Sequence, residues 1–373
     1  MPFALTVLCL SASLHFSDLT LFAQDQLLSV FYFQQVKGLT TGEIRSYVVR
    51  DPKGLVWVGT VNCLNRYDGY GVKEYWKNPS DLHAISSSTV HCMYVDRKNR
   101  LWLGTHESGL SLYDPLRDRF VNFIPRPGDS SWYQSQFIAT LLEDRSGNIW
   151  MTTSYGGVAR VELPSGNIAD SDSLFHKVHF TTYPLGTPRN IASSMLERED
   201  GRILIASDGG MIVLDPRTSE MSRLHFSDPT GRRLDSLNIL SLIQDSHGNL
   251  WVGTHDEGLY WLSQKSQRFP LYGLRDKDGS SPIFFTSVDR DKGGACWFMS
   301  SRGVLHQINI MTHKVVKRID ILHGQLLSYQ LIPTFIDRRG IYWDGTWGLG
   351  LFWVDLKNGH IRNYSVCVER RTR

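Results

Sequence analysis

The sequence has 373 residues, of which 41% are hydrophobic and 12% aromatic, enough to bury the core of one large domain or two ordinary ones. Lys and Arg total 40 against 37 Asp and Glu, and no basic run is interleaved with aromatic residues. This balance implies neither a nucleic-acid partner nor a basic contact with a membrane surface.

Residues 1–24 are typical of a secretory signal peptide. An apolar stretch from Phe3 to Leu14 is followed by a second from Leu19 to Ala23, and Ala23 is a suitable small residue before a cleavage site. No Lys or Arg precedes the first stretch, so a buried N-terminal strand is the alternative. No later segment approaches the roughly 20 apolar residues of a spanning helix. We therefore expect an exported, periplasmic chain without a further membrane segment.

A repeat of 45 to 54 residues fills the rest of the chain, and one position in each unit serves as its anchor. The anchors are Trp57, Trp102, Trp150, Leu204, Trp251, Trp297 and Trp343. Three residues earlier stand Gly54, Asn99, Gly147, Gly201, Gly248, Gly294 and Gly340, and three before those Asp51, Asp96, Asp144, Arg198, Asp245, Asp291 and Asp337. A strand-rich period of this length is typical of propellers and solenoids.

Each unit reads as four strands. A short apolar run such as 138–142 precedes the Asp, and Asp followed by Gly closes a tight hairpin. The next strand carries Trp-x-Gly-Thr, as in Trp57–Thr60, where the indole is expected to pack between neighbouring sheets. A Gly turn, a third strand and a fourth strand such as 120–124 complete the unit.

The repeat therefore predicts an all-β fold, a seven-bladed β-propeller of four-stranded antiparallel blades over residues 25–366, with 367–373 as an off-pattern tail. An open solenoid is the competing architecture, but its repeats are usually shorter. Either Leu28–Phe33 or His360–Val366 supplies the outer strand of the last blade.

Varied loop residues gather on one expected rim of the ring, which carries the loop after each Trp-x-Gly-Thr and the connection leading into each innermost strand. Aromatic, amide, carboxylate and guanidinium groups there suit an oligosaccharide, although any single member is more often an ordinary surface residue. The candidate ligand-binding residues are Arg45, His106, Glu107, Tyr133, Gln136, Tyr155, Arg189, Asn190, Asp208, His255, Asp256, Arg302, Tyr329 and Trp347.

Other chemistries have weaker support. His91, His106 and His255 fall in different units without metal-ligand spacing, and Glu107 with Asp256 is a glycosidase-like carboxylate pair of unknown separation. No catalytic triad, phosphate loop or dinucleotide fingerprint is present. We therefore expect no catalytic residues, no metal and no cofactor; a propeller lyase or glycosidase and a protein-interaction scaffold are the alternatives.

Three segments carry a family resemblance. Residues 141–150, residues 242–254 and Trp57–Thr60 with the following 64–69 are similar to the two-component regulator propeller repeat. The match extends over essentially the whole mature chain and is degenerate in the fourth and sixth units, where Leu204 and Met299 replace expected residues.

The resemblance implies the extracytoplasmic sensor region of a hybrid two-component system of Bacteroidetes, which detects an oligosaccharide and regulates polysaccharide utilisation. Members of this family typically continue into a second propeller, an immunoglobulin-like domain, a membrane helix and a histidine kinase. We expect any homodimer of this protein to form through such C-terminal regions. Because the chain stops off the repeat pattern at Val368–Arg373, we expect a truncated product that lacks the kinase and is not itself an enzyme.

Overall fold

The computed structural model describes residues 44–60, 62–68, 70–126, 128–129, 132–163, 177–225, 235–245, 247–255, 257–263, 271–272, 284–290, 295–300, 302–322, 335–336, 340–346 and 350–364. Every regular element within these ranges is a strand. The same ranges contain no helix with the length and hydropathy that a membrane span requires. The predicted signal peptide, the segment Leu28–Phe33 and the tail 367–373 lie outside the described residues.

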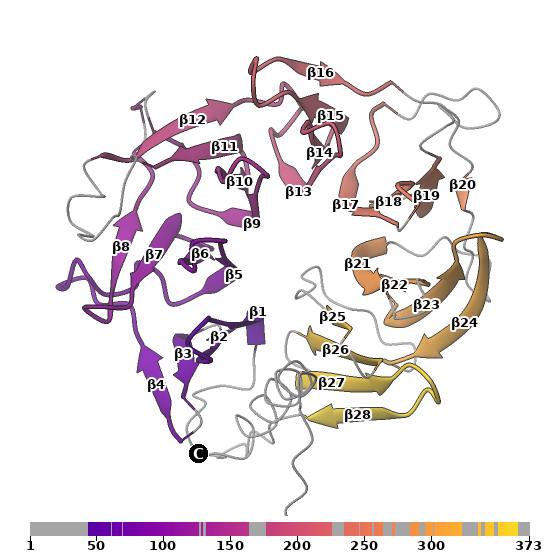
Figure 1. Cartoon of the computed structure of the whole chain (residues 1–373), viewed down its shortest axis with the longest axis horizontal. Coiled ribbons are helices and arrows are strands. Elements are labelled where there is room, and N and C mark those ends of the chain that lie inside the picture. Colours follow the sequence, from indigo (N-terminus) through magenta and orange to yellow (C-terminus); the bar gives the residue numbers. More distant parts are fainter. Residues whose placement is uncertain are drawn as a thin grey trace, which may run out of the picture.

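The described strands form seven four-stranded antiparallel sheets arranged in a ring (Figure 1). Each sheet is built from four consecutive strands that pair in chain order from the ring's centre outward. The innermost strands are β1 (Ile44–Arg50), β5 (Val90–Val95), β9 (Ile138–Glu143), β13 (Ala192–Glu197), β17 (Ile239–Gln244), β21 (Phe284–Arg290) and β25 (Phe335–Ile336). The second strands are β2 (Val56–Thr60), β6 (Leu101–Thr105), β10 (Ile149–Thr153), β14 (Ile203–Ser207), β18 (Leu250–Thr254), β22 (Cys296–Ser300) and β26 (Ile341–Thr346).

The outer half of each sheet follows the same order. The third strands are β3 (Leu64–Tyr67), β7 (Leu110–Asp114), β11 (Gly157–Glu162), β15 (Gly210–Leu214), β19 (Leu259–Leu262), β23 (Val304–Asn309) and β27 (Gly350–Asp355). The outer strands are β4 (Val72–Tyr75), β8 (Arg119–Phe123), β12 (His179–Tyr183), β16 (Met221–Arg223), β20 (Leu271–Tyr272), β24 (Lys314–Asp320) and β28 (Ile361–Tyr364).

The ring is closed by contact between its first and last sheets. Neighbouring innermost strands contact one another from β1 to β25, and β1 also contacts β26 of the last sheet. The outer strand of the last sheet is β28, which pairs with β27 from Leu351 opposite Tyr364 onward. The predicted all-β propeller of four-stranded antiparallel blades is thus confirmed, and the strand that completes its last sheet comes from the C-terminal side.

The first and second strands of a blade are joined by the turn that begins with the repeated Asp. In the second blade the Oδ1 atom of Asp96 accepts hydrogen bonds from the backbone N–H groups of Lys98 and Arg100, at 3.0 and 2.9 Å. Asn99 takes the position that Gly occupies in the other units and has a φ of 62°, a left-handed conformation that Asn tolerates better than other side chains. Among the described turns, the same capping by the repeated Asp occurs at Asp51, Asp144 and Asp245.

The repeated Asp also accepts a hydrogen bond from the repeated Trp six residues later. The Nε1 atoms of Trp57, Trp102, Trp150 and Trp251 donate to Asp51, Asp96, Asp144 and Asp245 at 3.1, 2.9, 2.8 and 3.1 Å. A buried indole N–H needs such a partner. In the fourth blade both partners change together, to Arg198 and Leu204, so no indole N–H is left to satisfy.

The hydrophobic core lies between the sheets. Trp57 packs with Leu103 and Phe120 of the second blade, and Trp150 packs with Ile203 and Ile212 of the fourth. The same relation holds for Trp102, Leu204, Trp251 and Trp297, each of which is buried against the following blade. The expected packing of indoles between neighbouring sheets is confirmed for these units, and burial of this apolar surface holds adjacent blades together.

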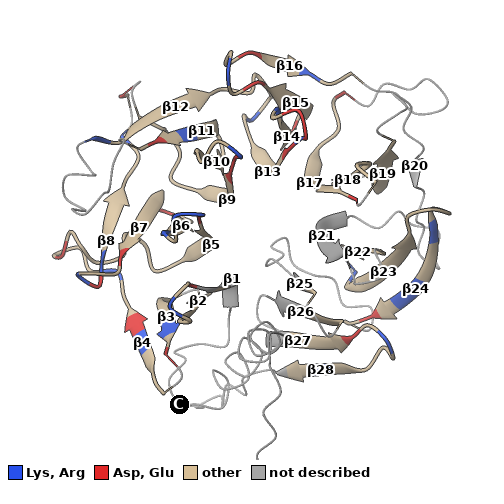
Figure 2. Ribbon diagram, viewed as in Figure 1, with Lys and Arg blue, Asp and Glu red and all other residues tan. Residues whose placement is uncertain are grey.

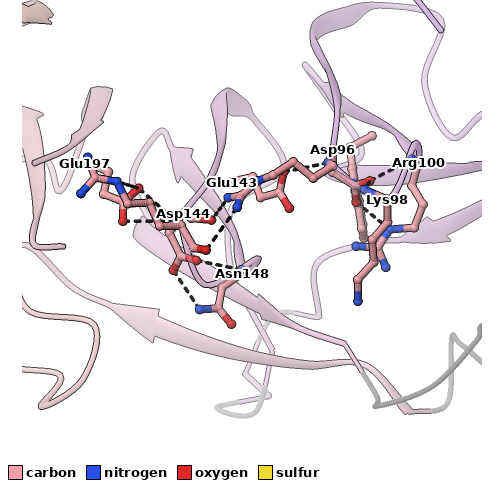
Figure 3. A network of polar contacts seen from close by, with 10 residues as sticks. Asp96, Lys98, Arg100, Glu143, Asp144, Asn148 and Glu197 are labelled. Carbon is pink, nitrogen blue, oxygen red and sulfur yellow. Dashed lines mark hydrogen bonds and ion pairs between the residues drawn. The ribbon is translucent and has the colours of Figure 1, made fainter. Parts of the chain in front are cut away.

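Polar links join successive blades on the rim that carries the Asp turns (Figure 3). The backbone N–H of Arg97 donates to Oε2 of Glu143 in the next blade at 2.8 Å, and the Arg97 guanidinium lies 3.2 Å from the same oxygen. The backbone N–H of Arg145 makes the equivalent bond to Glu197 of the fourth blade at 3.0 Å. These carboxylates therefore connect the second, third and fourth blades in series.

Candidate functional site

The opposite rim carries the candidate ligand-binding residues, and we call it the loop rim. In the described part of the chain it includes the turns 106–109, 154–157, 208–210 and 255–258, without residue 256, and the connections 132–137, 184–191 and 235–238. Each turn joins the second and third strands of a blade, and each connection leads into an innermost strand. The geometry of the rim is set by contacts that repeat from blade to blade.

A buried hydroxyl closes each turn of the loop rim. The Oγ1 atom of Thr105 donates to the carbonyl oxygen of Gly109 at 2.8 Å, and Thr153 and Thr254 make the same bond to Gly157 and Gly258 at 2.9 and 2.8 Å. These hydroxyl groups belong to the Thr three residues after the anchor Trp, which in the third unit follows Thr152 in place of Gly, and all three residues are buried. Because each turn is fixed from inside the sheet, its outer residues are presented on a rigid support.

A second set of bonds ties each turn to the connection that leads into the following blade. The backbone N–H of Gly109 donates to the carbonyl oxygen of Gln136 at 2.7 Å, and that of Gly157 donates to Asn190 at 2.9 Å. Gly109 has a φ of +79°, and a Cβ added there would lie 2.0 Å from the Tyr133 hydroxyl. Only glycine fits this position, so adjacent blades meet closely along the rim.

One group of predicted residues comes together where the third and fourth blades meet. Tyr155 is 72% exposed and has a φ of +70°, which is uncommon for a bulky side chain. Its carbonyl oxygen accepts a bond from Nδ2 of Asn190 at 3.4 Å, while Oδ1 of Asn190 accepts one from the Leu185 N–H at 2.6 Å. The backbone therefore holds the Tyr155 ring toward solvent on this side of the propeller.

Asp208 organises the connection next to Tyr155. Its carboxylate accepts bonds from the Thr187 hydroxyl at 2.5 Å and from the backbone N–H groups of Arg189 and Ile191 at 2.8 and 3.2 Å. Desolvation of the carboxyl raises its pKa, but the bonds from Thr187, Arg189 and Ile191 outweigh this effect and hold the pKa of Asp208 below its ordinary value. The Arg189 side chain lies 3.7 Å from Asp208 and remains 58% exposed, which leaves its guanidinium accessible to a ligand.

A second group lies between the second and third blades. The ring of Phe137 is 4.6 Å from that of His91 and 4.9 Å from that of His106, measured between ring centroids. Glu107 and Gln136 are exposed beside them. This corner offers planar rings, a carboxylate and an amide, which are the groups that recognise sugar faces and hydroxyls.

Tyr133 lies in the interior, although the sequence placed it among the surface candidates. It is 1% exposed, its hydroxyl accepts a bond from the Leu110 N–H at 2.9 Å, and it donates to the carbonyl oxygen of Phe123. Desolvation raises the pKa of this phenol. The side chain supports the turn at Gly109 from below, so we leave Tyr133 out of the proposed binding surface.

The remaining candidates are spread around the ring or lie outside the described residues. His255 follows β18, and its N–H donates to Asn238 at 2.8 Å; Arg302 lies in the turn after β22. Arg45 belongs to β1, but its side chain is not among those described. Asp256, Tyr329 and Trp347 lie outside the described residues, so the carboxylate pair Glu107 and Asp256 has no described separation.

Among the described residues, no three His, Cys, Asp or Glu side chains form a group that could hold a metal ion. Both signs of charge are interspersed around the blades (Figure 2), without a continuous basic track.

The sequence reasoning missed the supporting residues of this rim. Thr105, Thr153 and Thr254 were visible as part of a repeated motif, and their repetition was the signal that they do the same task in each blade. The acceptors of the glycine N–H groups, Gln136 and Asn190, use backbone carbonyl oxygens, which any residue supplies. No sequence pattern could have identified those.

Comparisons with known proteins agree with the fold. The sequence model of the two-component regulator propeller family matches residues 84–107 and 233–256. No curated protein sequence is significantly similar to the chain.

Several solved structures share the architecture. One is an extracellular domain assigned to the hybrid two component system BT3049 from B. thetaiotaomicron, with 21% identity, a TM-score of 0.62 and coverage of 86% of this chain and 41% of that one. A catalytically inactive virginiamycin B lyase from Staphylococcus aureus has 13% identity and a TM-score of 0.58, over 83% and 94% of the two chains. The β-propeller domain of Cps50 from Myceliophteria thermophila has 13% identity and a TM-score of 0.54, over 89% and 99%. These likenesses establish the fold, and the chain spans about two fifths of the length of the BT3049 domain.

Proposed function

Because the chain carries repeats of the two-component regulator propeller family, we propose that it is the extracytoplasmic sensor propeller of a hybrid two-component system and binds an oligosaccharide on its loop rim. The observation that carries the proposal is the match of two separate repeats to this family, and the likeness to the BT3049 extracellular domain supports it. In this function the propeller recognises a ligand and does not transform it. Binding would regulate polysaccharide utilisation through domains of the longer protein.

The loop rim supplies groups suited to a sugar. The exposed Tyr155 ring offers a stacking face, Arg189 and Gln136 offer donors, and Glu107 offers an acceptor. The turns that carry Glu107 and Tyr155 are closed by buried threonine hydroxyls, which limits the ordering that binding requires.

Calorimetric titration of the purified chain with a panel of plant and host oligosaccharides tests the proposal. We expect saturable binding of at least one glycan without product formation. Tyr155→Ala and Arg189→Ala should each weaken that binding by about tenfold, since each removes a stacking or charged contact.

Matched controls separate the loop rim from general surface effects. Tyr70→Ala removes an even more exposed tyrosine, 97% accessible, from the turn between β3 and β4, which lies on the opposite rim. Arg217→Ala removes an exposed arginine paired with Asp215. Both should leave affinity unchanged. Turnover of a glycan or lactone would favour a lyase or glycosidase, and the absence of both binding and turnover would favour a protein-interaction scaffold.

A further inference from the structure

A groove with a volume of about 740 Å³ lies on the outer side of the second blade. One wall is the connection that runs from residue 77 to residue 86, between β4 and β5. The other is formed by β8 and the residues that follow it, Ile124 to Arg126. The connection 77–86 leads into the innermost strand β5, and Ser108 of the turn 106–109 also lines the groove, so the groove lies at the outer edge of the loop rim, with neither Tyr155 nor Arg189 among its lining residues.

The walls and floor of the groove are mainly apolar. Ile85 and Phe120 form part of the floor and are each 1% exposed, whereas Leu82 and Ile124 on the walls are 85% and 52% exposed. Two large apolar side chains exposed on the same groove and bordered by polar residues are typical of a binding surface, whereas single scattered ones are not.

The wall that carries Leu82 is fixed in place. The backbone N–H of Phe120 donates to the carbonyl oxygen of His83 at 2.9 Å. The Nδ2 atom of Asn122 donates to the carbonyl oxygens of Leu82 and Ala84 at 3.0 and 2.7 Å. These bonds hold the connection against β8, so the groove is preformed. The backbone at Leu82 is fixed in place, and its side chain is exposed from that fixed position.

Cationic groups border the groove. Lys77 and Arg126 both line it, and the Arg126 guanidinium is held over the Trp132 ring, 4.0 Å from the ring centroid. The single carboxylate among the lining residues, Asp81, uses Oδ1 to accept the N–H of His83 at 2.9 Å and so caps its own turn. Two cationic side chains and one carboxylate therefore line the groove, and Arg126 also pairs at 3.9 Å with Asp129, which lies outside the lining.

We propose that this groove binds a small amphipathic anion, whose apolar body packs between Leu82 and Ile124 and whose anionic group faces Lys77 and Arg126. A volume of this size suits a small-molecule ligand, and a mostly apolar site with a few charged groups is the usual composition of such a pocket. The ligand class differs from that of the proposed oligosaccharide surface, and of the turns named for that surface the groove shares only Ser108.

Two fluorescent probes of nearly the same shape test this assignment on the full chain. 8-Anilinonaphthalene-1-sulfonate carries an anionic sulfonate, and N-phenyl-1-naphthylamine has the same apolar body without it. We expect a saturable fluorescence increase with the anionic probe and binding at least about fivefold weaker with the neutral one. Leu82→Asp and Ile124→Asp should each abolish binding of both probes, whereas Lys77→Glu and Arg126→Glu should weaken only the anionic probe, by about fivefold or more.

Leu116→Asp is the matched control. Leu116 is 79% exposed and lies by a separate hollow of about 390 Å³ between the first two blades, so its variant should bind both probes as the unmodified protein does. Urea unfolding of each variant identifies any loss of fold, and two apolar variants are used so that one remains informative. Unchanged anionic-probe binding in a folded Leu82→Asp or Ile124→Asp protein would overturn the proposal, as would equal affinity for the two probes. An oligosaccharide titration of the Tyr155 and Arg189 variants, whether it succeeds or fails, bears on the proposed oligosaccharide surface and not on the groove, because neither residue lines the groove.

Discussion

The Nε1 atom of Trp150 donates a 2.8 Å hydrogen bond to Oδ2 of Asp144, the residue that opens the turn before its strand. The same carboxylate accepts the backbone N–H of Asn148 at 2.9 Å, so one side chain both shapes the turn and satisfies the buried indole. Asp144 and Trp150 are 2% and 0% exposed. This pairing explains why the fourth blade departs from the repeat at Arg198 and Leu204 together.

Asp144→Ala should lower the free energy of unfolding by about 2–4 kcal/mol, because it leaves the Trp150 N–H buried without an acceptor and removes the cap of the turn. Trp150→Leu should cost a similar amount through lost packing. The double variant should cost about 1–2 kcal/mol less than the sum, since no indole N–H then remains. Urea unfolding of the four proteins measures this coupling.

Asp200→Ala is the control for this cycle. Asp200 is paired with Arg202 at 2.7 Å, but both side chains are well exposed, so its loss should cost under about 1 kcal/mol. Strictly additive effects of the Asp144 and Trp150 substitutions would show that the hydrogen bond contributes nothing of its own.

Gly109→Ala should be far more destabilising than Gly128→Ala. Both glycines have a positive φ, +79° and +85°, so both alanine variants bear the same backbone strain of about 1–2 kcal/mol. A Cβ at Gly109 also meets the Tyr133 hydroxyl, whereas nothing lies within 4 Å of one at Gly128. We expect the difference in unfolding free energy to exceed about 2 kcal/mol, and Tyr133→Phe to recover part of it; equal costs would contradict the close approach.

Much of the fold was predictable because a propeller repeats its physical solution. The spacing of Trp57, Trp102 and Trp150, with Asp and Gly at fixed distances before each, is enough to predict four-stranded units, since turn chemistry and strand periodicity act locally. The packing of each indole against the next blade follows from that period. The hydrogen bond between each indole and its Asp could not be predicted in the same way, because two residues six apart in the chain come close together only once the hairpin has formed.

The binding surface was harder to predict, because exposure depends on contacts between blades. Tyr133 and Tyr155 have the same side chain and both lie in loop segments, yet one is 1% exposed and the other 72%. The difference arises from the connection beneath Gly109, which only the folded ring creates. The groove beside Leu82 escaped prediction for the same reason, since its walls lie some 40 residues apart in the chain.

Glu143 should contribute substantially to the free energy of unfolding, even though the side chain of its partner Arg97 is exposed. Its side chain is 3% exposed and accepts the backbone N–H of Arg97 from the neighbouring blade. Glu143→Gln keeps an acceptor for that N–H and should cost about 1 kcal/mol, whereas Glu143→Ala removes it and should cost about 2–3 kcal/mol. Urea unfolding of the two variants, side by side, measures the value of this link; equal losses would indicate that only the carboxylate charge matters.

The contribution of Asp118 to stability should disappear in acid. Its carboxylate accepts the Tyr75 and Tyr113 hydroxyls at 2.5 and 2.6 Å and pairs with Arg66 and Lys73 at 2.8 and 2.5 Å, across the boundary of the first two blades. Desolvation raises its pKa, but the bonds from Lys73, Tyr113 and Tyr75 and the charge of Arg66 together hold the pKa of Asp118 well below its ordinary value.

A carboxyl whose pKa is lowered by folding stabilises the protein fully above its unfolded pKa of about 3.9 and loses that effect as the pH falls toward the folded value. The difference in urea midpoint between the unmodified protein and Asp118→Asn should therefore be constant from pH 7 to about pH 5 and shrink below about pH 4. Lys73→Met removes one of the bonds that lower the folded pKa, so in that background the difference should be smaller at neutral pH and should finish shrinking at a higher pH, while still beginning to shrink near about pH 4. A difference that persists undiminished at pH 2.5, where the carboxyl of an unfolded chain is protonated, would mean that Asp118 acts through packing and not through its charge.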